Sequence, residues 1–472
     1  MTPDEFRTHG HALIDWIADY IEGVERYPVQ SAAAPGDIRS ALPAHPPSTP
    51  EPFDAVMADL ERIIVPGLTH WQHPSFFAYF PANSSYPSIL GELAAAGLGV
   101  QGMSWVTSPA CTELETLTLD WMRELLDLPE RFASTSPTGG GVIQGSASEA
   151  ALVGILSARW RATGGAVNTD GDTTRLVAYA TSQAHSSIEK GLRIAGIGTE
   201  RIRTVPHDDA YAMVPAALEA MVAEDRAAGL RPFFVCATRG TTSSLAFDPL
   251  PEIGDIARRA ELWLHVDGAM SGIGAFDPDL RWINDGLELA DSYATNPHKW
   301  MGVNFDCDLY WTADRHSLLG ALSILPEYLR SQAAEDGAVI DYRDWQIPLG
   351  RRFRALKLWF ALRCDGVDAF RDMIDRHIAL TQELAALVAA DDRFEIVAPH
   401  PLNLLCLAVR DDDPDVANAR TEALIEAANA TGQVLLTRTV LDGRTVIRIS
   451  VGARTTERRH VVGAWELLQS LV

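Results

Sequence analysis

Cysteine and lysine are scarce in this 472-residue chain, and each scarcity limits the kinds of site that the protein can contain. The five cysteines are odd in number and widely spaced, so they form neither a CxxC pair nor a metal-ligand cluster. We therefore expect no bound metal and a reducing, cytoplasmic location. Only three lysines, Lys190, Lys299 and Lys357, stand among the 39 basic residues, so lysine-dependent chemistry has three candidates.

Long apolar runs and an excess of positive charge are also missing. No window approaches the roughly 18 unbroken apolar residues of a membrane span. The N-terminus, Met1 to Glu5, lacks the basic start and apolar stretch of a secretory signal. The formal net charge of −24 argues against nucleic acid and anionic membranes as partners. What remains is an ordinary globular composition, in a chain long enough for two or three domains.

Residues 1–84 are expected to form an N-terminal helical segment. Thr2 can cap a helix with Pro3 at its first position, and an apolar stripe then runs from Leu13 to Val24 at helical spacing. Prolines crowd residues 28–52, which predicts an extended connection, and a second stripe follows over residues 53–64. Two helices cannot bury such stripes alone, so this segment is expected to pack on another domain or another subunit.

Residues 85–360 alternate short apolar runs with helical patterns. Strands are predicted at 176–179, 233–236 and 262–266, with helices such as 150–160 and 215–228 between them. This alternation predicts an α/β domain whose mainly parallel sheet is covered by helices on both faces. Residues 361–472 change character, with a long helix at 370–390 and strands at 404–409 and 446–450, which predicts a smaller C-terminal α+β domain.

Four features fall at the ends of predicted strands, where open α/β sheets bind ligands. A glycine-rich turn leads into a helix at 139–149, His185 follows one strand, Asp267 closes another, and Lys299 lies among aromatic and apolar residues. Each has an ordinary explanation: a plain helix start, a structural histidine, a helix cap, a surface lysine. Together they suit an aldehyde cofactor, which needs an amine anchor, a phosphate cradle, a carboxylate for its pyridine nitrogen and an aromatic lid.

Several longer motifs carry a family resemblance. They are Pro74–Pro81, Ser108–Glu115, Gln144–Glu149, His265–Asp267, Asn296–Trp300 and Trp345–Phe353. In this order they closely resemble the group II pyridoxal-phosphate (PLP) decarboxylases, above all the aromatic-L-amino-acid decarboxylases. The resemblance covers nearly the whole chain and implies an aspartate-aminotransferase-type fold (fold type I). It also implies a homodimer with shared active sites, in which the N-terminal helices wrap the partner.

The resemblance assigns roles to individual residues. Lys299 corresponds to the lysine that carries PLP, Asp267 to the partner of the pyridine nitrogen, and His185 to the histidine that stacks on the ring. Tyr328 corresponds to a tyrosine that assists protonation of the reaction intermediate, so the implied catalytic set is Lys299, His185, Tyr328 and Asp267. The remaining implied cofactor contacts are Ala147, Ser148, Thr242, Ala269, Asn296 and His298.

The implied substrate pocket departs from the family in places. Its residues are Trp71, Tyr79, Phe80, Ala82, Gln101, Met103 and His185. Animal members usually have Thr where this chain has Ala82, Phe where it has Met103, and an apolar residue where it has Gln101. These changes weaken a preference for catechols. Beside the pocket, the usual Asp-Ala-Ala-Tyr is Asp267-Gly268-Ala269-Met270.

The prediction is PLP-dependent decarboxylation of an aromatic L-amino acid, of the tryptophan, phenylalanine, tyrosine or dopa type, to its amine. The alternatives are an aromatic aldehyde synthase, which typically has Phe for Tyr328 or Asn for His185, and a decarboxylase of a non-aromatic amino acid. An aminotransferase fits the motifs less well. A serine hydrolase using Ser146 or Ser148 is disfavoured because no G-x-S-x-G elbow is present, and a dead scaffold is disfavoured by the complete Lys299, Asp267 and His185 set.

Overall fold

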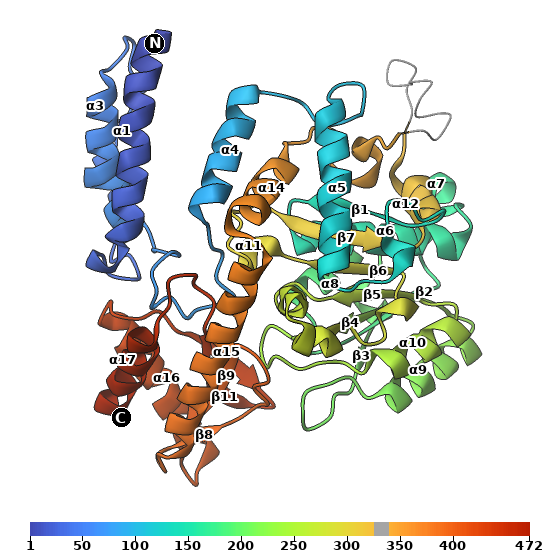
Figure 1. The fold of residues 1–472 in the computed structure, drawn as a ribbon. Coiled ribbons are helices and arrows are strands. Elements are labelled where there is room, and N and C mark those ends of the chain that lie inside the picture. The colour runs from blue at the N-terminus through green and yellow to red at the C-terminus, as the bar shows by residue number, and fades with distance from the viewer. Residues whose placement is uncertain (325–338) are drawn as a thin grey trace. The chain divides into compact units, whose positions relative to one another are not determined.

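The computed structural model describes residues 1–324 and 339–472, which form two compact units (Figure 1). The larger unit comprises residues 82–381 and 398–406, and the smaller unit comprises residues 1–81, 382–397 and 407–472.

A seven-stranded sheet forms the centre of the larger unit. The strands are β1 (Gly140–Gln144), β2 (Leu176–Thr181), β3 (Ile202–Val205), β4 (Arg231–Thr238), β5 (Trp263–Asp267), β6 (Ser292–Thr295) and β7 (Asp308–Thr312). Their order is β1-β7-β6-β5-β4-β2-β3, and β7 runs antiparallel to both of its neighbours, β1 and β6. All residues of β1, β2, β5, β6 and β7 are buried, as expected for a sheet that is covered on both faces.

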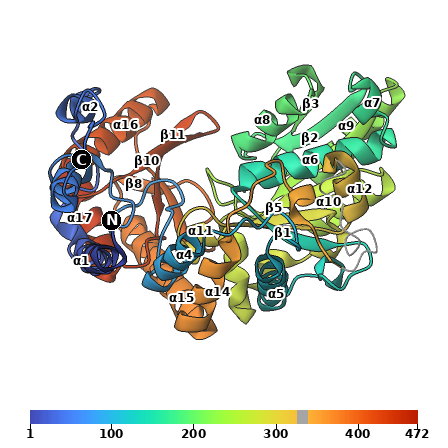
Figure 2. The ribbon, with the colours of Figure 1, turned by 90° about the horizontal axis from the view of Figure 1, so that it is seen from above.

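Helices cover both faces of this sheet (Figures 1 and 2). The helices of the unit are α4 (Tyr86–Leu98), α5 (Pro109–Leu125), α6 (Ala147–Thr163), α7 (Val167–Asp170), α8 (Ser186–Ile194), α9 (Pro215–Ala227), α10 (Leu250–Arg259), α11 (Pro297–Trp300), α12 (Arg315–Leu322), α14 (Arg354–Asp365) and most of α15 (Val367–Ala389). Helix α6 packs on one face, with Ala150 and Val153 against Val142, Ala294 and Tyr310. Helix α9 lies on the other face, where Tyr179 of β2 donates a 2.7 Å hydrogen bond to Asp225.

The smaller unit combines N-terminal helices with the C-terminal α+β segment. Its helices are α1 (Pro3–Glu22), α2 (Asp37–Ala41), α3 (Phe53–Asp59), α16 (Pro414–Ala430) and α17 (Arg458–Leu471). A four-stranded sheet has the order β10-β11-β9-β8, with β8 (Phe394–Ile396), β9 (Leu404–Val409), β10 (Thr437–Leu441) and β11 (Arg444–Ser450). All of this sheet except the first three residues of β9 belongs to the smaller unit. Thr2 caps α1 through a capping box with Glu5, as its sequence predicts. In the described residues, no helix is both long and apolar enough to cross a membrane.

Two expectations from the sequence differ in detail from the structure. The proline-rich stretch is not extended throughout, because α2 forms at Asp37–Ala41, where the chain is free of proline and Gly36 turns into the helix with a φ of 100°. Residues 361–381 also belong to the larger unit, whereas the sequence predicts domains at 1–84, 85–360 and 361–472. Hydrogen bonds from Trp300 to His377 and from Arg371 to the carbonyl of Phe276 tie α15 to that unit.

Candidate active site

The predicted cofactor residues meet at one edge of the seven-stranded sheet. Strands β1, β2, β4, β5 and β6 run in the same direction, so their carboxyl ends share an edge. The turn before α6 follows β1, His185 follows β2, Thr242 follows β4, Asp267 ends β5, and Lys299 follows β6. This edge of an open α/β sheet is where ligands bind.

The amino end of α6 supplies an anion site at this edge. Ser146 caps the helix by accepting from Glu149 N, and Gly145 N donates to Glu149 Oε2 at 2.9 Å. The N–H groups of Ala147 and Ser148, at the first helical positions, have no partner within the helix. Ala147 is half-buried and Ser148 exposed, so these N–H groups and the positive end of a 17-residue helix are accessible to a phosphate.

His185 is held by the first turn of α8, which it caps. Its Nδ1 accepts from Ser187 N at 3.2 Å and lies 2.8 Å from Ser187 Oγ, while the ring remains accessible to solvent. The surrounding protein lowers the pKa of His185; partial desolvation is the main cause, Lys299 adds to it, and Asp267 opposes it. His185 is therefore a neutral ring within electrostatic reach of both Asp267 and Lys299.

Asp267 and Lys299 occupy neighbouring strand ends. The Asp267 side chain is 7% exposed, and its Oδ1 accepts from Ala269 N at 3.0 Å, which leaves Oδ2 for a bound group. Lys299 is half-buried in α11, a short helix that Asn296 begins through a 3.0 Å bond from Lys299 N to its carbonyl. A carboxylate and an amine are thus presented from adjacent strands.

The other predicted cofactor residues lie around this pair. Thr242 is half-buried after β4, Asn296 is 2% exposed, and Ala269 is half-buried. His298 is buried, and its Nδ1 accepts from Cys307 N at 3.0 Å. Burial, followed by repulsion from Lys299, lowers the pKa of His298 to about 3, so this ring is neutral.

Gly268 stands where members of the resembled family usually have alanine, and the space around it is filled by a buried side chain. A Cβ atom at this position would lie 2.8 Å from Cε2 and 2.9 Å from the hydroxyl of Tyr293, a fully buried side chain of β6. The tyrosine ring fills the space that the alanine methyl group would need. An alanine here would therefore require the Tyr293 ring to shift, whereas glycine fits beside Asp267 without such a change.

The predicted substrate residues are divided between the two units. Trp71, Tyr79 and Phe80 belong to the smaller unit, where the Trp71 and Tyr79 rings stack with centroids 5.6 Å apart. Ala82, Gln101 and Met103 belong to the larger unit. The side chain of Gln101 is already engaged, because its Oε1 accepts from Arg351 N at 2.6 Å. Tyr328 lies outside the described residues.

One buried ion pair escaped the sequence analysis although both partners stand in its motifs. Arg351 donates to Glu115 at 2.7 and 3.0 Å, and both side chains are almost fully buried. Arg351 also donates to the carbonyl of Ile143, and Glu115 accepts from Ile143 N. The pair thereby fixes the end of β1, directly before the α6 turn. Because 236 positions separate the partners, no local pattern could reveal it.

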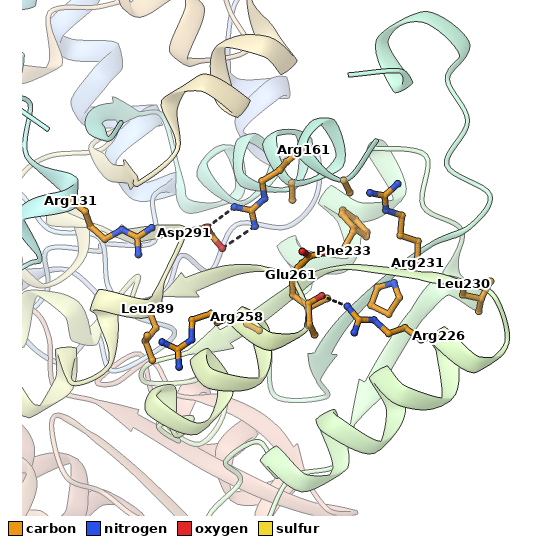
Figure 3. A pocket seen from close by; sticks show the side chains of 16 residues that line it. Arg131, Arg161, Arg226, Leu230, Arg231, Phe233, Arg258, Glu261, Leu289 and Asp291 are labelled. Atoms are coloured by element: carbon orange, nitrogen blue, oxygen red, sulfur yellow. Dashed lines mark hydrogen bonds and ion pairs between the residues drawn. The ribbon is translucent and has the colours of Figure 1, made fainter. Parts of the chain in front are cut away.

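An arginine-rich hollow of about 540 Å³ lies at the opposite edge of the sheet (Figure 3). Arg161, Arg226 and Arg258 stand in the last turns of α6, α9 and α10, where a cation offsets the negative end of the helix dipole. Arg161 pairs with Asp291 at 2.7 Å, and Arg226 donates to the Ala260 carbonyl at 2.6 Å. Helix-end neutralisation thus accounts for these arginines, and the chemistry concentrates at the other edge.

The residues at the carboxyl edge fit PLP. The accessible amino end of α6 suits its phosphate, the buried carboxylate of Asp267 suits a protonated pyridine nitrogen, and the accessible ring of His185 suits stacking on a planar group. Lys299 is the amine at this edge. Of the other two lysines, Lys190 is exposed on α8, and Lys357 is fully buried and pairs with Glu92 at 2.9 Å.

Comparison with known proteins identifies the family. Residues 35–410 match the model of the pyridoxal-dependent decarboxylase conserved domain. The chain is 44% identical to tryptophan decarboxylase 2 of Oryza sativa (99% of this chain, 95% of that protein) and 46% identical to phenylacetaldehyde synthase of Arabidopsis thaliana (99% and 96%). The crystal structure of Oryza sativa TDC with PLP and tryptamine superposes with a TM-score of 0.97, at 40% identity over 100% of this chain and 98% of that one. The chain belongs to the pyridoxal-dependent decarboxylase family, whose cofactor is PLP.

Proposed function

We propose that this enzyme removes the carboxylate of an aromatic L-amino acid and releases the corresponding amine. The observation that carries the proposal is the meeting of His185, Asp267 and Lys299 at the carboxyl edge of the sheet, beside the accessible amino end of α6. Relatives at 44–46% identity include a tryptophan decarboxylase and a phenylacetaldehyde synthase, which supports an aromatic substrate.

Each residue of the site has a separate role in this reaction. Bound PLP supplies an electron sink for the bond to the departing carboxylate. Lys299 holds the cofactor and is displaced by the substrate amine. Asp267 keeps the pyridine nitrogen protonated, and His185, neutral and anchored through Nδ1 to Ser187, covers the ring and orients the substrate carboxylate. A proton must then be delivered to the substrate carbon, and we assign that delivery to Tyr328.

The substrate class is tested with a panel of amino acids. Purified holoenzyme is incubated with tryptophan, 5-hydroxytryptophan, phenylalanine, tyrosine, dopa and, as a non-aromatic member, glutamate. Stoichiometric CO₂ and amine from one or more aromatic substrates support the proposal. Turnover of glutamate alone would contradict it, while leaving the family assignment intact.

Aldehyde formation is the second candidate, because one relative is a phenylacetaldehyde synthase. That reaction consumes O₂ and water and yields aldehyde, CO₂, ammonia and H₂O₂, whereas decarboxylation consumes one proton and yields amine and CO₂. This chain has His185 and Tyr328 rather than the Asn or Phe of the aldehyde-forming members that it resembles. We therefore propose amine as the product.

Replacing Tyr328 by phenylalanine is expected to exchange amine for aldehyde. Losing a positioned acid slows proton delivery by roughly 10²- to 10⁴-fold, so the carbanionic intermediate persists and reacts with oxygen. Amine, aldehyde and H₂O₂ are quantified for the variant, the parent and a Tyr86→Phe control, whose tyrosine is half-exposed on α4. Amine formation at the parental rate in Tyr328→Phe would make Tyr328 a bystander and point to His185.

We further propose a homodimer that forms through the N-terminal helices. None of the residues of α1, all of them described, is buried, and Phe6 and Ile14 are 64% and 41% exposed. On the larger unit, Leu90, Leu93 and Leu98 of α4 are 46%, 49% and 61% exposed. Apolar patches of this kind mark interaction sites, and a second copy of the chain suits the family resemblance. Its five cysteines, all among the described residues, form no disulfide bond, which suits a reducing compartment such as the cytoplasm.

Charge placed on α1 is expected to separate the dimer. In the double variant Phe6→Glu, Ile14→Glu, two apolar contacts worth about 2 kcal/mol each are replaced by charges, which weakens association on the order of 10³-fold. Light scattering at micromolar concentration should then report the monomer mass. The control variant Thr8→Glu, His11→Glu changes exposed polar residues of the same helix and should remain dimeric. A dimeric Phe6→Glu, Ile14→Glu variant would contradict the assignment of this surface.

A further inference from the structure

Asp308 is a buried carboxyl group that none of the roles above uses. It begins β7, is 0% exposed, and neither of its oxygens has a hydrogen-bond partner among the residues that the structure describes. Because β7 runs antiparallel, its first residue lies at the edge where the other strands end. A buried, unpaired polar group costs stability unless it is neutralised or bonded, so Asp308 requires an explanation.

Two buried amide oxygens flank Asp308 in the sheet. Gln144 of β1 lies directly opposite Asp308 in the register. On the other side of β7, Thr295 of β6 pairs with Leu309. Extending this antiparallel register by one residue places Asn296 opposite Asp308. A hydrogen bond from His298 N to the Cys307 carbonyl keeps the two segments together at this point. Side chains of directly opposite residues lie on the same face, with Cβ atoms about 4.5–5.5 Å apart. Gln144, Asp308 and Asn296 therefore form a row across β1, β7 and the end of β6.

The side-chain oxygen atoms in this row lack hydrogen-bond donors among the described residues. In the described part of the chain, Gln144 Oε1 and Asn296 Oδ1 are buried and accept no hydrogen bond, and the Gln144 amide nitrogen is engaged with the Trp345 carbonyl at 2.8 Å. An ionised Asp308 would only add acceptors. A protonated Asp308 would supply a hydroxyl donor between two acceptors.

The charges around Asp308 agree with a protonated group. It faces Asp267 of β5 and Glu149 of α6, which are negative, and Lys299 of α11 and Arg354 of α14, which are positive. Burial first, and then Asp267 and Glu149, raise the pKa of Asp308 well above its usual range, against the opposing effect of Lys299 and Arg354. Arg354 is also shared with Asp306, at 3.0 Å.

We propose that Asp308 is a positioning residue held as a neutral carboxylic acid, whose hydroxyl donates to one of the two flanking amide oxygens. This bond ties Asp308 of β7 either to the end of β1, which leads into the α6 turn, or to the Asn296 turn that carries Lys299. Asp308 thereby fixes one part of the cofactor site, the phosphate cradle or the amine, to the strand that lies between the two. The inference rests on the proposed role of Lys299.

Two variants distinguish a role of Asp308 as a neutral hydrogen-bond donor from a role as a negative charge. The side-chain amide of Asp308→Asn is close in shape to a carboxylic acid and can donate in its place, whereas Asp308→Ala leaves the amide oxygens unpaired. The affinity for PLP, titrated through visible absorbance, should stay within about twofold in Asp308→Asn and fall about tenfold or more in Asp308→Ala. Equal losses in both variants would show that the charge is what matters and would overturn the proposal.

The pH dependence of stability provides a readout that does not require activity. A folded-state pKa above the unfolded one means that the parent loses stability as pH rises beyond the usual Asp pKa of about 4, until the folded pKa is reached. The side chain of Asp308→Asn cannot ionise, so the melting temperature of the variant minus that of the parent should rise from pH 5 to pH 8. The neighbouring charged groups are the same in both proteins, so their contributions to the pH dependence cancel in this difference. These groups are Asp267, Glu149, Lys299 and Arg354. A difference that is constant or falls with pH would overturn the proposal.

Asp248→Asn is the matched control. Asp248 is another buried carboxyl group, but it accepts from Met213 N and Thr238 N, each at 2.7 Å. An amide nitrogen there would meet a backbone donor, so Asp248→Asn should melt below the parent across this pH range. If Asp308→Ala does not accumulate as folded protein, the comparison of Asp308→Asn with the parent decides alone. Failure of the Lys299 assignment is distinguishable, because it appears as reductive labelling of another lysine.

Discussion

Lys299→Ala is expected to reduce amine formation by roughly 10³-fold or more and to remove the visible absorbance band of the holoenzyme. The reason is that Lys299 is the amine that would hold PLP at the carboxyl edge of the sheet, and an alanine there has no group to replace it. Fold and stability should change little, since Lys299 is half-buried. Absorbance spectra and rates of amine formation check both expectations.

Borohydride reduction of the parent holoenzyme tests the same assignment directly. Peptide mapping should place the pyridoxyl group on the peptide that contains Lys299. Lys190→Arg, on the exposed surface of α8, is the control and should retain both the absorbance band and the activity. A label on Lys190 or Lys357, or an active Lys299→Ala variant with an unchanged spectrum, would contradict the assignment.

Arg351→Met is expected to lower the free energy of unfolding by about 3–5 kcal/mol. The methionine fills much of the arginine's volume but leaves Glu115 as an uncompensated charge, with its side chain only 4% exposed. Hydrogen bonds from Arg351 to Gln346 and to the Ile143 carbonyl are lost as well. Urea unfolding monitored by circular dichroism measures the change.

Arg352→Met is the neighbouring control. The Arg352 side chain is 61% exposed and pairs with Glu92, so its replacement should cost less than about 1 kcal/mol. The two variants change the same residue type at adjacent positions, and burial of the ion pair is the main difference between them. Equal effects from Arg351→Met and Arg352→Met would show that the buried pair contributes nothing special.

The elements that carry the chemistry could be predicted from local sequence. The apolar run before Asp267 becomes β5, which ends at that residue, and the helix predicted over 150–160 lies within α6. His185, Asp267 and Lys299 each follow or end a strand, and parallel strands bring such residues to one edge without any knowledge of long-range contacts. The meeting of the three residues was therefore predictable in outline.

Features that depend on distant partners could not be predicted in this way. The pairing of Arg351 with Glu115 requires α5 and the segment after residue 345 to meet beside β1. Asp308 looks like a polar residue at a strand start, and its isolation from donors becomes visible only when β7 is placed between β1 and β6. Likewise, helix α2 forms within a proline-rich stretch whose composition favours extended chain.

The contact between Gly268 and Tyr293 couples the energetic effects of substitutions at the two positions. A methyl group added at Gly268 meets the buried ring, unless a smaller residue replaces Tyr293. Conversely, the loss of Tyr293 in the presence of Gly268 opens a cavity beneath β5, next to the aspartate of the site. Either change alone is therefore expected to cost stability, and alanine at position 268 should be tolerated best together with a smaller residue at position 293.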